Sequence, residues 1–122
     1  MKLRIQGNSL RLRLTKTEVK TFCKTGKFEQ QSRFTENTLN YRLVKGMHQD
    51  IKASFIDNSM IISISETLVQ DWDENERIGF EYLQELTNGE TLFLLIEKDF
   101  VCLDETLEDQ SDNYTNPKSL NL

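Results

Sequence analysis

The feature that most constrains this chain is an internal repeat with an offset of about fifty residues. In each half, two short runs alternate apolar and polar residues, a short helical pattern follows, and two more alternating runs complete the half. Identical residues recur across the offset at five positions: Lys2 and Lys52, Asn8 and Asn58, Ser9 and Ser59, Thr17 and Thr67, and Val19 and Val69. Because each half is too small to close a core alone, we expect the two to pack on each other.

Local patterns predict eight strands and two short helices. A capping box from Thr15 to Glu18 begins the first helix, and Gly26 ends it. Phe22 and Trp72 fall at matching positions of the two predicted helices, so both are expected in the core. Period-two alternation predicts strands at 2–6, 9–14, 27–34, 38–44, 51–56, 60–64, 78–86 and 91–98.

The element order predicts a mostly β (α+β) fold. We expect a single small pseudo-two-fold barrel of antiparallel hairpins with two short helices. One domain is expected over residues 1–103, made of two repeats at about 1–46 and 50–100, and an acidic C-terminal tail is expected over 104–122.

Charge is distributed unevenly along the chain. Residues 1–50 hold 11 of the 15 Lys and Arg but four of the 20 Asp and Glu, a net charge of +7, whereas residues 51–122 carry −12. Such asymmetry indicates an interaction surface of one sign, an acidic tail that covers it, or acids that serve solubility. The net charge of −5 for the whole chain argues against a general nucleic-acid binder.

The first predicted hairpin gathers cations on one face. If its leucine and isoleucine side chains point inward, four cations point outward together: Lys2, Arg4, Arg11 and Arg13. We call these four residues the basic face. Arginine grips phosphate through its planar fork, so the basic face is the candidate nucleic-acid-binding site. The alternative is a solvated strand face whose cations pair with acids of the second half.

The run from Gly7 to Leu14, followed by the short helix and Gly26, resembles the swapped-hairpin unit of AbrB transition-state regulators and MazE antitoxins. The run from Asn58 to Ser65 resembles a second copy. The resemblance implies one small barrel of interlocked hairpins, with both halves fused in one chain, and DNA bound by basic residues near the first strands.

The basic positions of that family match only the first copy. They fall on Arg4 and Arg13, whereas Ser54 and Ser63 occupy the corresponding places in the second copy. A proline that is usual in the family is also replaced, for example by Thr15. A second resemblance spans nearly the whole chain, from residues 2–14 to the acidic segment near the end, and is to a family of small uncharacterised bacterial proteins. It implies no activity.

The C-terminal tail concentrates acids within nine residues: Asp104, Glu105, Glu108, Asp109 and Asp112. Dense carboxylates suit calcium or magnesium, but the spacing does not match a calcium loop and no glycine supplies its sharp turn. The tail is therefore predicted to be a loosely packed acidic segment. Coverage of the basic face and metal binding are the alternatives.

Residues that carry catalysis are sparse. His48 is the only histidine and lies in a predicted turn, so a serine or cysteine nucleophile would need to come from elsewhere in the fold. Cys23 and Cys102 are too far apart for zinc or redox spacing and are expected to be reduced thiols. No phosphate-binding glycine loop or His/Cys metal cluster is present in the sequence, so neither an enzyme nor a cofactor is expected.

These patterns predict a cytoplasmic, non-enzymatic binding module for an unknown partner, in a protein-interaction or antitoxin-like role. The alternative is an AbrB-like DNA-binding transcriptional regulator that uses the basic face. No apolar run approaches the roughly 18 residues that span a bilayer, so no membrane partner is expected. The first residues alternate like a strand and lack the apolar centre of a signal peptide.

Overall fold

The protein folds into two β-sheets and one helix. The computed structural model describes residues 1–100 and 111–115. The predicted mostly β fold is confirmed, and each strand lies close to its predicted range. Within the described residues the elements are β1 (Lys2–Ile5), β2 (Ser9–Leu14), α1 (Lys16–Thr25), β3 (Lys27–Arg33), β4 (Thr38–Gly46), β5 (Ile51–Ile56), β6 (Ser59–Ser65), β7 (Gly79–Glu85) and β8 (Thr91–Lys98).

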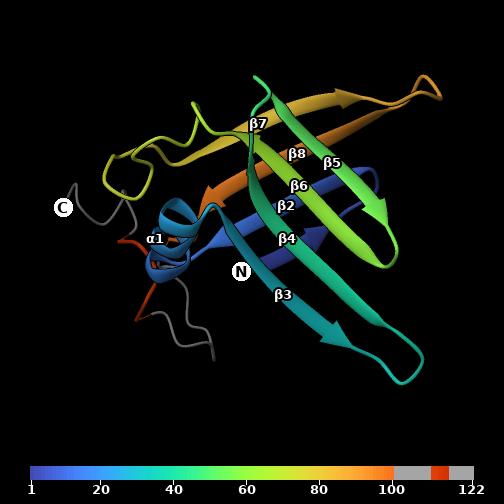
Figure 1. Ribbon diagram of the computed structural model, residues 1–122, viewed down its shortest axis with the longest axis horizontal. Helices are drawn as coiled ribbons and strands as arrows, with labels where there is room; N and C mark the ends of the chain where they lie inside the picture. Colours follow the sequence, from blue (N-terminus) through green and yellow to red (C-terminus); the bar gives the residue numbers. More distant parts are fainter. Residues whose placement is uncertain (101–110, 116–122) are drawn as a thin grey trace.

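Each sheet combines one hairpin from each half of the chain. The strand order is β1-β2-β8-β7 in one sheet and β3-β4-β6-β5 in the other, and the two sheets cross over one another (Figure 1). The four hairpins are antiparallel, but the central pairs, β2 with β8 and β4 with β6, are parallel. The prediction of antiparallel hairpins alone is therefore corrected: parallel pairing joins the halves.

The expected closed barrel is not found among the described residues. Both four-stranded sheets are open, with β1 and β7 at the edges of one and β3 and β5 at the edges of the other. The buried hydrophobic side chains form one cluster, to which both sheets and α1 contribute. Phe22 and Trp72 are fully buried in this cluster, as predicted.

The predicted features of α1 are confirmed. The Thr15 side chain accepts a hydrogen bond from the Glu18 amide, and the Glu18 carboxylate accepts one from the Thr15 amide. Gly26 ends the helix in the left-handed conformation, at φ 87°, where a side chain would be strained.

The second predicted helix is a series of turns between Ser65 and Glu76. Its backbone hydrogen bonds mix three- and four-residue spans, such as Trp72 N to the Val69 carbonyl oxygen and Val69 N to the Ser65 carbonyl oxygen. Asp71 interrupts any regular helix with φ 58°. Even so, Val69 and Trp72 are fully buried, so the turns deliver the apolar side chains that the helix was expected to supply.

The molecule has two distinct ends. The four hairpin turns lie on the right of Figure 1, whereas α1 and the turns of residues 65–76 lie on the left. We call these the hairpin end and the helix end. No helix in the described residues is long and apolar enough to cross a membrane.

Candidate functional site

The strand pairing brings the four predicted cations together. In the register of β1 and β2, Lys2 lies opposite Arg13 and Arg4 lies opposite Arg11. Directly opposed residues of an antiparallel pair project from the same face, so the basic face exists as a surface of the β1–β2 hairpin.

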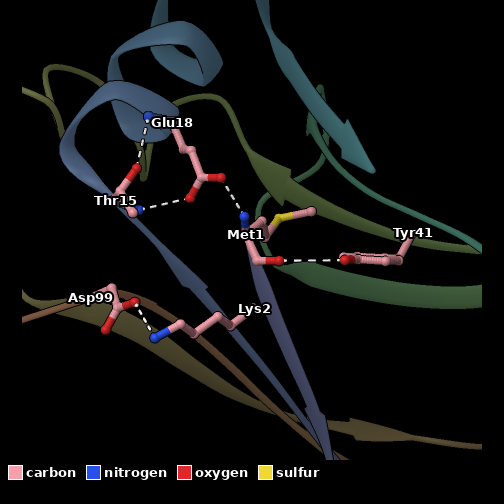
Figure 2. A network of polar contacts seen from close by, with 6 residues as sticks. All are labelled: Met1, Lys2, Thr15, Glu18, Tyr41 and Asp99. Atoms are coloured by element: carbon pink, nitrogen blue, oxygen red, sulfur yellow. Dashed lines mark hydrogen bonds and ion pairs between the residues drawn. The ribbon is translucent and has the colours of Figure 1, made fainter. Parts of the chain in front are cut away.

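Acids of the second half contact most of this face. The Nε atoms of Arg11 and Arg13 both lie 2.8 Å from Glu97 Oε1, and Glu97 is the next residue across the sheet from Arg13. Lys2 Nζ lies 3.2 Å from Asp99 Oδ2 (Figure 2). The sequence could not locate these partners, because they follow more than eighty residues after the hairpin.

Arg4 differs from the other three cations. It is exposed, and no ion pair joins it to an acid in the described part of the chain. It lines a small recess of about 210 Å³ together with Arg11 and Phe93. The ion pairs of Arg11 and Arg13 are partly buried: these two side chains are 31% and 39% exposed, and that of Glu97 is 15% exposed. An incoming anionic ligand would therefore have to compete with Glu97 for both arginines.

An apolar pocket opens between the two sheets, among residues of the strand ends nearest the hairpin turns. It has a volume of about 360 Å³ and is lined by Leu3, Ile5, Leu10, Leu39, Ala53, Ser54, Phe55, Met60, Leu86 and Leu92. The side chains of Ile5 and Phe55 are 61% and 65% exposed. Alternation places Ile5 and Phe55 on the inner faces of β1 and β5, although the sequence predicted an interior position for Ile5.

The two edge strands that border this pocket, β1 and β5, differ in what occupies their free edges. In β5, the Ala53 amide donates to Gln84 Oε1 at 2.7 Å, and Gln84 Nε2 donates to the Ala53 carbonyl oxygen at 3.2 Å. The Gln84 side chain thus takes the place of a neighbouring strand and links β5 to β7. The sequence did not predict this contact between the Gln84 side chain and the Ala53 backbone, because the two residues lie 31 positions apart.

Among the described residues, no such side chain covers β1. Gln6 donates to the Ser9 carbonyl oxygen across the turn, so backbone groups alternate from there, and Leu3 and Ile5 direct theirs away from β2. In the described residues, β1 pairs with β2 alone. Leu3 therefore has the position in β1 that Ala53 has in β5. In the described residues, however, no glutamine side chain bonds to the backbone amide and carbonyl groups of Leu3.

The N-terminus holds β1 in place at its other end. The Met1 amino group forms an ion pair with Glu18, the same carboxylate that caps α1 (Figure 2). Tyr41 Oη, from β4 of the other sheet, lies 3.5 Å from the Met1 carbonyl oxygen. These contacts fix the start of β1, while within the described residues the edge from Leu3 to Ile5 stays open.

His48 meets a serine and an acid. Its Nε2 lies 2.6 Å from Ser63 Oγ, and its Nδ1 lies 2.8 Å from Asp50 Oδ1. The contact with Asp50 lacks hydrogen-bond geometry, since neither Nδ1 nor Oδ1 has a hydrogen-bond partner. The arrangement therefore differs from a catalytic triad, in which the acid accepts a hydrogen bond from the imidazole N–H. It attaches the turn after β4 to β6.

The polar pocket at the helix end contains the free thiol Cys23. This pocket, about 650 Å³, lies between α1 and the 65–76 turns, with lysines such as Lys20 and Lys45 and acids such as Asp73 on its walls. Burial raises the pKa of the Cys23 thiol, which keeps it protonated and weakly nucleophilic. Cys102 lies outside the described residues. No group of three or more metal-ligating side chains is found in the described ranges.

Residues 111–115 pack at the helix end. Asp112 accepts hydrogen bonds from the Lys16 amide and from Thr17 Oγ1, at 3.0 and 2.9 Å. Hydrogen bonding from Thr15 holds the pKa of Asp112 below its usual value. The described part of the predicted acidic tail thus contacts α1, while Asp104, Glu105, Glu108 and Asp109 lie outside the described residues.

A family model, described as a family of unknown function (DUF7009), matches residues 1–118. No curated protein and no solved structure matches the chain.

Proposed function

Because the chain belongs to DUF7009, a family of unknown function, we propose a function from its geometry. The protein is a non-enzymatic binding module that accepts an extended segment of a partner protein as an additional strand on β1. The observation that carries this proposal is the open edge of β1, which lies between the apolar pocket and the basic face.

The side chains of β1 specify the chemistry of the partner. An added strand would continue the cross-strand rows that β1 begins. On the inner face, Leu3 and Ile5 line the apolar pocket, so the partner's side chains there are apolar. On the outer face, Lys2 and Arg4 of β1 lie opposite Arg13 and Arg11 of β2, so the whole face is positively charged. The partner's side chains there are therefore acidic. The partner is therefore a segment that alternates apolar and acidic residues.

The two edges near the pocket differ in a way that selects β1. The bidentate contact of Gln84 occupies the β5 edge at Ala53. A buried or paired edge does not recruit another strand, whereas an open one is a template for pairing. The partner strand consequently adds to β1, and Phe55 of β5 contacts it only across the pocket.

Synthetic peptides test the proposal. A short labelled peptide that alternates valine and glutamate is titrated with the full chain and followed by fluorescence anisotropy, beside a peptide that alternates valine and lysine. We expect the acidic peptide to bind at least about tenfold more tightly, which corresponds to about 1.4 kcal/mol. Equal affinity for the two peptides, or no binding of either, would contradict the proposal.

Variants locate the binding edge. Ile5→Pro removes an outward amide that the β1–β2 ladder does not use, so it should abolish peptide binding with β1 still paired to β2. Phe55→Asp should weaken binding by placing a charge in the apolar pocket. Phe34→Asp is the matched control, because Phe34 is equally exposed, at 65%, but does not line the pocket.

DNA binding by the basic face is the second candidate. It rests on the resemblance to AbrB and on Arg4, which has no acidic partner in the described residues. Binding of a labelled duplex should weaken steeply with salt and fall when Arg11 and Arg13 are both replaced by alanine. Ile5→Pro, in contrast, leaves all four cations of the basic face in place. It should therefore abolish strand addition but not phosphate binding, which separates the two candidates.

A further inference from the structure

Lys98, the last residue of β8, is a buried lysine with 4% of its surface exposed. Its Nζ donates to the Asn75 carbonyl oxygen at 2.7 Å, and no other acceptor for this group is found among the described residues. An ammonium group carries three donors, so two are left for a further acceptor. No carboxylate of the described residues forms an ion pair with it, and burial lowers the pKa of Lys98 by desolvating the charged form.

Two aromatic rings flank this ammonium group. Nζ lies 5.8 Å from the centroid of Trp72 and 5.0 Å from that of Tyr114. Ring faces attract a cation, and this attraction is stronger where water is excluded. Tyr114 comes from the segment 111–115, which reaches the end of β8 through a hydrogen bond from its amide to the Asp99 carbonyl oxygen at 2.8 Å.

Lys45 shows how much of this arrangement a structural role explains. Lys45, near the end of β4, donates to the Cys23 carbonyl oxygen at 2.6 Å and lies 6.0 Å from the centroid of Phe22. One carbonyl acceptor and one aromatic ring are thus enough to hold the ammonium group of Lys45, which has the place in the first half that Lys98 has in the second. Lys98 has the same two contacts and, in addition, the ring of Tyr114. Both lysines line a cavity, but that of Lys45 is polar, whereas the one beside Lys98 has apolar side chains on its wall.

The cavity has a volume of about 440 Å³, within the range of small-molecule sites. Besides Lys98, its wall includes the apolar side chains Ile78, Phe100 and Tyr114. The exposed ammonium group of Lys16 adds a second positive charge, and Glu76 is the one carboxylate among the lining residues. Burial raises the pKa of Tyr114 to about 12, so its hydroxyl stays protonated and able to donate.

We propose that this cavity, the lysine pocket, binds a small organic carboxylate with an apolar or aromatic body. The carboxylate accepts hydrogen bonds from Lys98 and is attracted by Lys16. The apolar body contacts Ile78, Phe100 and the ring of Tyr114. This site lies at the helix end and does not depend on strand addition to β1, so either proposal can fail without the other.

Benzoate and its neutral analogue benzamide are the probes. Trp72 is the only tryptophan of the chain and its ring lies beside Lys98, so its emission reports occupation of the lysine pocket. We expect a saturable change of Trp72 emission with benzoate, at a dissociation constant at least about tenfold lower than with benzamide. Equal affinity for the two probes, or no saturable change with benzoate, overturns the proposal.

Two variants and a matched control test which ammonium groups attract the carboxylate. Lys98→Met should remove the preference for benzoate, whereas Lys45→Met, the matched control, should retain it. Lys16→Ala changes an exposed side chain and should weaken benzoate binding severalfold without disturbing the core. Lys16→Ala therefore still tests the proposal if Lys98→Met does not fold. Retention of the benzoate preference in folded Lys98→Met, or unchanged affinity in Lys16→Ala, counts against the lysine pocket.

Discussion

Two glycines are required for steric reasons that differ in kind. A Cβ at Gly46 would lie 2.4 Å from both His48 Nε2 and Ser63 Oγ, which are side-chain atoms. A Cβ at Gly79 would lie 2.5 Å from the carbonyl oxygen of Ile96, a backbone atom within β8. A side chain can rotate away from a new methyl group, whereas the backbone of a central strand cannot.

We therefore predict an order of stability for two alanine variants. Gly46→Ala should lower the free energy of unfolding by about 1–2 kcal/mol, because His48 and Ser63 lose their contact as they move. Gly79→Ala should lower it by about 3 kcal/mol or more, because β7 must separate from β8. Urea denaturation of the two variants and the wild type measures both losses. Equal losses, or the reverse order, would contradict the steric explanation.

At the scale of elements, one side chain substitutes for a strand. Gln84 offers an amide whose donor and acceptor match those of the Ala53 backbone, so the edges of β5 and β7 are joined although they belong to different sheets. The register places Ser32 of β3 at the position that corresponds to Gln84 of β7. A serine is too short to reach β1 in the same way.

Removal of this link should cost stability without changing the fold. Gln84→Ala leaves the Ala53 amide and carbonyl groups without their partners, so we expect a loss of about 1–2 kcal/mol in urea denaturation. Gln31→Ala is the control, since Gln31 is exposed on β3 and, in the described part of the chain, its side chain accepts one hydrogen bond, from Arg33 two residues along at 3.4 Å. That control should stay within about 0.5 kcal/mol of the wild type. A loss as large in the control would show that strand propensity, not the link, is responsible.

The elements were predictable to the extent that their causes are local. Alternation and turn residues such as Asp57 and Asn58, both at positive φ, specify a hairpin within a few residues. The same holds for the capping box at Thr15. The second helix was predicted wrongly because the apolar spacing of Val69 and Trp72 is helical, and nothing in the pattern shows that Asp71 takes a left-handed conformation.

Contacts between distant segments account for the rest. The basic face was predictable because all four cations belong to one hairpin, and alternation alone places them on one side. Its partner Glu97 was not, because β8 pairs with β2 only in the folded chain. The pocket at Lys98 also escaped prediction, since it needs Trp72, Tyr114 and the end of β8 to meet.

At the scale of the whole molecule, neither half contains a complete sheet. The hairpin β1–β2 finds its central neighbour in β8, and the hairpin β3–β4 finds its own in β6. A two-stranded hairpin is marginally stable at best in water. Each half alone is therefore expected to remain unfolded, although it contains every residue of its own two hairpins.

Division of the chain at the exposed turn between β4 and β5 tests this dependence. Met47 in that turn is 93% exposed, so a break after it removes no core contact. Residues 1–47 and 48–122, prepared separately, should each lack strand signal in circular dichroism, and an equimolar mixture should recover it together with the emission of buried Trp72. A folded structure in either fragment alone would contradict the interdependence of the halves.

The interleaved sheets also determine the order of events when the chain is made. Arg13 and Glu97, neighbours across β2 and β8, are 84 residues apart. On a ribosome, β1 and β2 emerge before β8, and one face of their apolar side chains stays exposed until β8 has left the exit tunnel. Closing so long a loop is slow relative to local pairing. The chain therefore completes its fold only after β8 has emerged, and until then its first hairpin needs protection from aggregation.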